Sequence, residues 1–198
     1  MTMRLLLFGG FLGSGKTTLI IRLADALARK QRRVAVVVNE VGEIGIDNQL
    51  MRSVGLDVWE LSSGCICCSL AGDLLQTLEQ LAADHAPEIV IVEASGAADP
   101  GKVLAMLPNF HGPVLQSVST SIVLDPLRLP MLFEVATPLI TTQIRNADTL
   151  VITKADLGSE EEIEATRRIG AEINPDARIY VLAATESDQW PLEDLIKP

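Results

Sequence analysis

A glycine-rich segment near the start of the chain has the residues needed to bind phosphate. Residues 9–18 read GGFLGSGKTT, which fits the pattern G-x-x-x-x-G-K-[ST] and directly follows an apolar run. In this pattern the glycines turn backbone N–H groups toward phosphate oxygens, the lysine bridges the β- and γ-phosphates, and the threonine hydroxyl binds Mg²⁺. We therefore predict a nucleoside triphosphate site built on Gly10, Gly13, Gly15, Lys16 and Thr17.

Two later motifs, each directly after an apolar run, fit the same ligand. Glu93 ends one such run and could contact Mg²⁺ or its water shell, while the N–H of Gly96 could donate to the γ-phosphate. Residues 153–156 read TKAD. The carboxylate of Asp156 could accept two hydrogen bonds from guanine, a pair of donors that adenine lacks, and the stem of Lys154 could pack along the base. These motifs predict a magnesium site and a preference for guanine.

The three cysteines of the chain, Cys65, Cys67 and Cys68, lie together after a Ser-Ser-Gly turn. Three thiolates that converge on a soft metal ion would explain this clustering, which core packing does not require. Cys67 and Cys68 could alternatively form a redox pair. A tetrahedral zinc site needs a fourth ligand, and spacing singles out none of the candidates, which are Glu40, Glu43, His85 and His111.

An acidic, glycine-containing loop at residues 39–47 lies between the two sites in the sequence. The phosphate loop and the cysteine turn both follow predicted strands, so in a parallel sheet they lie along the same edge. Glu40 and Glu43 would then suit a switch that orders around Mg²⁺ and the γ-phosphate, and either could orient the attacking water. The alternative is a solvated acidic loop.

The elements that position these residues are indicated by short aliphatic runs without alternation, which are typical of strands covered on both faces. The runs are residues 5–8, 34–38, 89–92, 122–124, 150–152 and 179–182. Helical spacing between them is found at Leu19, Leu23 and Leu27, at Leu74, Leu78 and Leu81, and over residues 160–173. We predict an α/β fold with a three-layer, open, mainly parallel sheet and helices on both faces.

Alternating apolar and polar residues at 56–61 predict an edge strand, and residues 108–113 and 125–130 are predicted to form loops.

The 198 residues include 26 acidic and 16 basic side chains, for a net charge of −10, and only 4% are aromatic. This balance argues against a broad surface for nucleic acid or anionic lipid. No apolar run reaches the roughly 18 residues of a membrane span. We expect one domain over residues 1–198, in a reducing, cytoplasmic compartment, without nucleic-acid or membrane partners.

Together these residues resemble the CobW/HypB/UreG family of P-loop GTPases, and most closely its CobW-like branch. The resemblance rests on five segments in the family's order: GFLGSGKTT (10–18), VNEVGEIGID (38–47), LSSGCICC (61–68), EASGAADP (93–100) and TKAD (153–156). It implies the P-loop NTPase fold. It also implies a GTPase that couples hydrolysis to the delivery of zinc, cobalt, another transition metal or a metal cofactor to a client metalloprotein.

The resemblance also implies roles for single residues. Its ligands are GTP, Mg²⁺ and Zn²⁺ or another transition metal, and proteins of this mechanistic class often form homodimers across the nucleotide edge. The implied residues are Gly13, Ser14, Gly15, Lys16, Thr17 and Thr18 for phosphates and Mg²⁺, Glu40 and Glu43 for the switch, Cys65, Cys67 and Cys68 for the metal, Glu93 and Gly96 for Mg²⁺ and the γ-phosphate, Lys154 and Asp156 for the base, and Ala183 and Ala184 closing over it.

The sequence departs from the family pattern at two points. The family usually has asparagine at the position of Thr153. The threonine predicts a weaker hydrogen bond between the base and the phosphate loop, and therefore a less strict selectivity for guanine. Many CobW-like proteins continue into a second domain, so we expect client recognition here to use a partner or a dimer surface. Two other functions fit the residues: an ATP-dependent small-molecule kinase or ligase, and a nucleotide-binding metal or redox sensor without significant turnover.

Overall fold

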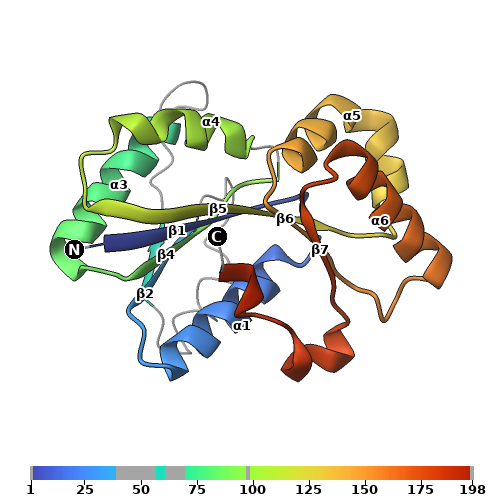
Figure 1. Cartoon of the computed structure of the whole chain (residues 1–198), viewed down its shortest axis with the longest axis horizontal. Coiled ribbons are helices and arrows are strands. Elements are labelled where there is room, and N and C mark those ends of the chain that lie inside the picture. Colours follow the sequence, from blue (N-terminus) through green and yellow to red (C-terminus); the bar gives the residue numbers. More distant parts are fainter. Residues whose placement is uncertain (1, 39–56, 61–69, 97–98, 197–198) are drawn as a thin grey trace.

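The computed structural model describes residues 2–38, 57–60, 70–96 and 99–196, and it confirms the predicted α/β fold (Figure 1). One sheet contains seven strands in the order β3-β2-β4-β1-β5-β6-β7. Every neighbouring pair in it is parallel. The strands are β1 (Thr2–Gly9), β2 (Val34–Val38), β3 (Asp57–Glu60), β4 (Ile89–Glu93), β5 (Val114–Leu124), β6 (Thr149–Ile152) and β7 (Arg178–Val181).

Helices cover both faces of this sheet. In the view of Figure 1, α3, α4, α5 and α6 lie above the sheet and α1 lies below it. The helices are α1 (Lys16–Arg29), α3 (Leu70–His85), α4 (Pro100–Met106), α5 (Leu129–Arg145) and α6 (Glu160–Ile173). Short 3-10 helices are η1 (Leu107–Asn109), η2 (Ala184–Gln189) and η3 (Asp194–Ile196).

The central strand β1 explains why the aliphatic runs do not alternate with polar residues. Leu5 and Leu7 belong to the core formed with α3, and Leu6 and Phe8 belong to the core formed with α1. All four side chains are at most 3% exposed. Because both faces of the strand are covered, each position must be apolar. Strand β3 lies at the edge of the sheet, as the alternating pattern of residues 56–61 predicts.

Several elements differ from the sequence expectation. Helix α4 was not predicted, and the expected loop at residues 108–113 begins within η1. Strand β5 is eleven residues long and begins at Val114, whereas the aliphatic run indicated only its last three residues. Its earlier part contains Ser119, Thr120 and Ser121, which are buried although polar. The expected loop at residues 125–130 ends early, because α5 begins at Leu129. Sequence periodicity gave no indication of α5.

The middle of α5 shows why that helix is hard to predict. Pro138 lies inside it, and Ala136 has non-helical dihedral angles, φ −139° and ψ 27°. A proline in a helix removes one backbone hydrogen bond and clashes with the preceding turn, so it bends the helix. The side-chain hydroxyl of Thr137 donates to the carbonyl of Phe133 at this bend.

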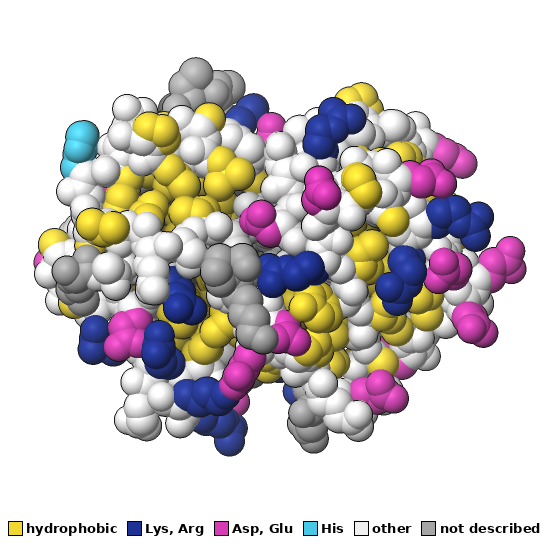
Figure 2. All heavy atoms as spheres, in the orientation of Figure 1, with side chains coloured by type: hydrophobic (Ala, Val, Ile, Leu, Met, Phe, Trp, Pro, Cys, Tyr) yellow, Lys and Arg dark blue, Asp and Glu magenta, His cyan; other side chains and the backbone are white. Residues whose placement is uncertain are grey.

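All strands end at the same edge of the sheet because all are parallel. The loops that follow β1, β4, β5, β6 and β7 therefore meet at one place, and this edge is where open α/β sheets bind ligands. On the face shown in Figure 2, acidic and basic side chains are interspersed, and several acidic ones lie on the side of α6. Within the described ranges, no helix is long and apolar enough to cross a membrane.

Candidate nucleotide site

The glycine-rich loop between β1 and α1 forms an anion-binding turn. Gly10, Gly13 and Gly15 have φ angles of 129°, 75° and 90°, in the region that other residues avoid. Gly15 is the N-cap of α1 and contributes no side chain to cap the first turn. The first N–H groups of α1, together with the positive end of its dipole, therefore face the loop, which is the usual arrangement for binding phosphate.

Lys16 and Thr17, the first two residues of α1, carry the charged and hydroxyl groups of this turn. The ammonium of Lys16 donates to the carbonyl of Phe11 at 2.9 Å, so the lysine folds back over the loop. The hydroxyl of Thr17 donates to Oε1 of Glu93 at 2.8 Å. Glu93 is the last residue of β4 and is 5% exposed. The structure thus brings together the two side chains that the sequence assigned to Mg²⁺.

An open cleft of about 350 Å³ lies at this edge. Hydroxyl, carboxylate and ammonium groups line it together with glycine backbone, a combination suited to phosphates and a divalent cation. Its lining residues are Leu12, Gly13, Gly15, Lys16, Thr17, Thr18, Glu93 and Lys154.

Gly96 packs closely against the backbone of the phosphate loop. A Cβ atom placed on Gly96 would be 3.0 Å from the backbone nitrogen of Leu12, so this position has little room for a side chain. The carbonyl of Gly96 accepts a hydrogen bond of 3.3 Å from the side-chain amide of Gln143, a buried residue of α5. The structure therefore places Gly96 beside the loop that the sequence expects to hold the phosphates.

The TKAD turn after β6 is bonded directly to the phosphate loop. The hydroxyl of Thr153 donates to the carbonyl of Ser14 at 2.6 Å and lies 3.2 Å from the carbonyl of Leu124. Thr153 is 5% exposed. The threonine hydroxyl therefore joins the TKAD turn to the phosphate loop. The weaker connection between base and phosphate loop that the sequence predicts for Thr153 stays a prediction.

Asp156 is held by the loop that follows β7. Its Oδ1 accepts a hydrogen bond of 2.9 Å from the backbone N–H of Ala184. The carbonyl of Ala183 in turn accepts from the indole N–H of Trp190 at 2.7 Å. The guanidinium of Arg22 lies 5.2 Å from the centre of the Trp190 ring. The structure thus places Ala183 and Ala184 beside the carboxylate predicted to read the base, and α1 supports this loop through Trp190.

Two residues of the turn after β5 contact this site but were not predicted from the sequence. Asp125 is 4% exposed, and its Oδ2 forms an ion pair of 2.7 Å with the ammonium of Lys154. Arg128 donates from Nη1 to the carbonyl of Leu12 at 2.9 Å. A signal for Asp125 was available, because it follows an aliphatic run directly, as Glu93 does. Arg128 has no such signal.

Five predicted residues of the switch and the metal site lie outside the described residues: Glu40, Glu43, Cys65, Cys67 and Cys68.

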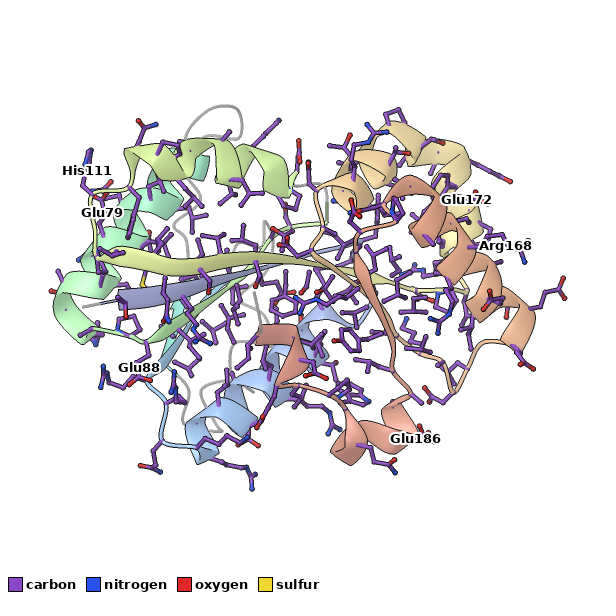
Figure 3. All side chains as sticks on the ribbon, in the orientation of Figure 1. Glu79, Glu88, His111, Arg168, Glu172 and Glu186 are labelled. Atoms are coloured by element: carbon purple, nitrogen blue, oxygen red, sulfur yellow. The ribbon has the colours of Figure 1, made fainter. Side chains whose placement is uncertain are left out.

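Both candidate histidines lie away from the phosphate loop. His85 ends α3 and His111 precedes β5, so both are at the amino-terminal edge of the sheet, opposite the loop. The backbone N–H of His111 donates to Glu79 at 2.7 Å (Figure 3). In the part of the chain that the structure describes, no group of three or more His, Cys, Asp or Glu side chains could hold a metal ion.

This loop, the Thr17–Glu93 pair and the parallel sheet together define a P-loop nucleotide-binding protein. A family model described as the nucleotide-binding domain of CobW/HypB/UreG matches residues 4–181. The chain belongs to the CobW/HypB/UreG family.

Proteins with names that refer to zinc are among the relatives. The zinc chaperone YeiR of Escherichia coli K12 is 33% identical over 165 residues, covering 82% of this chain and 49% of YeiR. A zinc-regulated GTPase metalloprotein activator of Schizosaccharomyces pombe is 31% identical over 180 residues, 86% of this chain and 43% of its own. The chain therefore spans less than half the length of either relative.

A solved structure supports the fold. The Zn(II)-bound YjiA GTPase of E. coli superposes with a TM-score of 0.64 at 22% identity, covering 91% of this chain and 57% of YjiA. At this level of identity the likeness concerns the fold, and it agrees with the seven-stranded parallel arrangement described above.

The hydroxyl of Thr153 offers a direct test of the connection between the two motifs. In Thr153→Val the carbonyl of Ser14 loses a buried partner, which costs about 1–2 kcal/mol. We expect Tm to fall by roughly 3–6 °C for a chain of this size. We also expect nucleotide affinity to fall several-fold, because the phosphate loop is held less firmly. Differential scanning fluorimetry and fluorescent-nucleotide titration measure the two effects.

Thr166→Val is the matched control, because Thr166 is a buried threonine of α6, away from the loop. It is expected to change Tm without changing nucleotide affinity. If Thr153→Val binds nucleotide as well as the parent protein does, the hydrogen bond to Ser14 does not support the phosphate loop.

Proposed function

We propose that this protein is a GTP-hydrolysing metallochaperone, in which the nucleotide state controls the binding of a transition metal and its delivery to a client protein. GTP binding and hydrolysis are supported by the way the predicted motifs contact one another. Thr17 is hydrogen-bonded to Glu93 inside the cleft, and the Thr153 hydroxyl joins the TKAD turn to the phosphate loop. Family membership and the names of the relatives support the metal part. Together they favour this function over a kinase or ligase.

The donors in the cleft fit a magnesium ion. The Thr17 hydroxyl and the Glu93 carboxylate supply hard oxygen atoms, which Mg²⁺ prefers. When bound with a nucleotide, Mg²⁺ would neutralise charge that develops on the phosphates. Lys16 would add positive charge at the β- and γ-phosphates, and the N–H groups of the loop and of α1 would hold the phosphate oxygens. Catalysis would rest on positioning and charge, with Glu40 or Glu43 orienting water.

The metal is cargo, and we propose that Cys65, Cys67 and Cys68 bind it. Thiolates are suitable ligands for Zn²⁺, and zinc is the metal in the names of the relatives. A metalloprotein activator among the relatives supports a client metalloprotein as partner. We further propose that residues 1–198 form one domain, that the protein acts in the cytoplasm, and that a homodimer across the nucleotide edge contributes to client binding.

Guanine selectivity is proposed to come from Asp156. Its carboxylate is fixed by the N–H of Ala184 and lies on the same turn as Lys154, which lines the cleft. In Asp156→Asn the side chain keeps its shape but one of its two acceptors becomes an amide donor. Each hydrogen bond to a charged group contributes about 1.5–3 kcal/mol, so the preference for GTP over ATP should fall roughly ten- to a hundredfold. Competition binding of the two nucleotides measures this ratio.

Asp176→Asn, a change at an exposed aspartate beyond α6, should leave the ratio unchanged. A parent protein that prefers ATP would contradict the proposal and favour the kinase or ligase alternative. An Asp156→Asn protein that discriminates as well as the parent would show that another group reads the base.

A further inference from the structure

The turn between β5 and α5, residues 125–128, contacts both walls of the nucleotide cleft. One wall is the TKAD turn, residues 153–156, and the other is the phosphate loop. On one side, Oδ2 of Asp125 lies 2.7 Å from the ammonium of Lys154 in the TKAD turn. On the other side, Nη1 of Arg128 donates to the carbonyl of Leu12 in the phosphate loop at 2.9 Å. A Cβ atom on Gly13 would lie only 2.6 Å from this nitrogen, so the arginine packs directly on the loop. Four consecutive residues thus join the two walls.

The turn itself is held firmly. Oδ1 of Asp125 accepts from the backbone N–H of Leu127 at 3.0 Å. Its carbonyl accepts from the N–H groups of Arg128 at 3.2 Å and Leu129 at 2.9 Å, where α5 begins. The Asp125 side chain is 2% exposed. Because the turn and the start of α5 fix this carboxylate, it holds Lys154 in one place.

The ion pair with Asp125 controls where the Lys154 side chain lies. Lys154 has a φ of 56°, in the left-handed region, and it lines the cleft beside the phosphate loop. An ammonium released from Asp125 would leave a buried carboxylate unpaired, which is strongly unfavourable. The stem of Lys154 is therefore kept along the cleft, where it would border the base. Asp125 acts on the nucleotide through Lys154.

Arg128 acts at the other wall. Its guanidinium bonds the carbonyl of Leu12, the residue that precedes Gly13 in the phosphate loop. The arginine side chain is exposed, and this hydrogen bond holds its guanidinium against the phosphate loop. A displacement of the loop at Leu12 would move Arg128, and Arg128 is three residues from Asp125 in the same turn.

We propose that residues 125–128 couple base recognition to phosphate binding, with Asp125 and Arg128 as the two positioning residues of this coupling. The inference rests on the proposed GTP site and adds a prediction that the site alone does not make. A change at Arg128, on the phosphate side, should alter the choice between guanine and adenine. A change at Asp125, on the base side, should alter the choice between GTP and GDP.

The experiment is a double-mutant cycle on the full chain with Asp125→Asn and Arg128→Met, because methionine has no donor for the Leu12 carbonyl. Dissociation constants for GTP, GDP and ATP are measured by competition against a fluorescent guanine nucleotide. Each single change should weaken GTP binding about tenfold, within the range of coupling found between contacting residues. Because breaking either end disconnects the two walls, the double variant should also be weakened only about tenfold. Arg128→Met should reduce the GTP-to-ATP preference at least threefold.

Two further variants separate positioning from general damage. Arg128→Lys retains a donor for the Leu12 carbonyl and should recover most of the nucleotide selectivity. Arg167→Met, at a half-buried arginine of α6 that pairs with Glu164, should change none of the three constants. Because Arg128 is exposed, its variant tests the inference even if Asp125→Asn does not fold.

Independent effects would overturn the inference: a double variant weakened about a hundredfold, or an Arg128→Met protein with unchanged base preference. In either case the parent protein would still bind GTP, and the proposed function would stand. A parent protein that binds no guanine nucleotide would instead overturn the proposed function, and the coupling with it.

Discussion

Lys16→Ala should hydrolyse GTP at least a hundredfold more slowly than the parent protein and should bind GTP more weakly. Lys16 opens α1, is 6% exposed and lies folded over the phosphate loop, with its ammonium 2.9 Å from the Phe11 carbonyl. Loss of one preorganised donor at a developing charge typically costs about 10²–10³ in kcat. Single-turnover hydrolysis of GTP, with nucleotide titration alongside, measures both effects.

Lys102→Ala is the matched control for this prediction. Lys102 is an exposed lysine of α4, outside the residues that line the cleft, and its loss should change neither rate nor affinity. A thermal melt of Lys16→Ala separates loss of catalysis from loss of the fold. Unchanged turnover in a folded Lys16→Ala protein would show that the glycine-rich loop is not the site of hydrolysis.

A protein in which Cys65, Cys67 and Cys68 are all serine should lose its high-affinity zinc site. Serine hydroxyls are harder and far less acidic than thiols, so they do not replace thiolates on Zn²⁺. Changes to groups outside the ligand shell already cost 10–100-fold in metal affinity, and removal of three ligands should cost more than about 100-fold. Anaerobic titration of zinc against a competing chelator measures the change.

The histidines provide the control for the cysteine experiment. His85 and His111 lie at the edge of the sheet opposite the phosphate loop, so changing both to glutamine should leave zinc affinity unchanged. If the serine variant binds zinc as the parent does, the cysteines are not the metal site. If the parent instead forms a disulfide and binds no zinc, the redox alternative is correct.

The sequence predicted the elements in which one physical requirement dominates. Strands covered on both faces must be aliphatic throughout, which identified β1, β2, β4 and β6. Helix α6 was predicted with its observed ends, because its charged face is periodic and Asn174 with Pro175 stops it. The first part of β5 escaped prediction because its buried residues Ser119, Thr120 and Ser121 are polar and interrupt the aliphatic pattern. Its backbone is held by a residue far along the chain, since the N–H of Thr120 donates to Asp148.

In the candidate site, too, residues within local motifs could be predicted, whereas contacts between distant segments could not. Lys16, Thr17, Glu93 and Asp156 could be predicted because motifs fix their type and spacing. The role of Arg128 depends on Leu12, which is 116 residues away in sequence, and no local pattern records that contact. The hydrogen bond from the Thr153 hydroxyl to the carbonyl of Ser14 is a similar case, because it joins residues that are 139 positions apart in sequence.

The bend in α5 has a mechanical consequence for the nucleotide edge. The first half of this helix continues from the turn that carries Arg128, whereas the second half carries Gln143, which holds Gly96. Pro138 has no backbone N–H, so α5 lacks one backbone hydrogen bond near the bend at Ala136. The helix is weakest at this bend. Tilting of one half therefore need not displace the other, and the loops after β5 and β4 can adjust to an occupant one at a time.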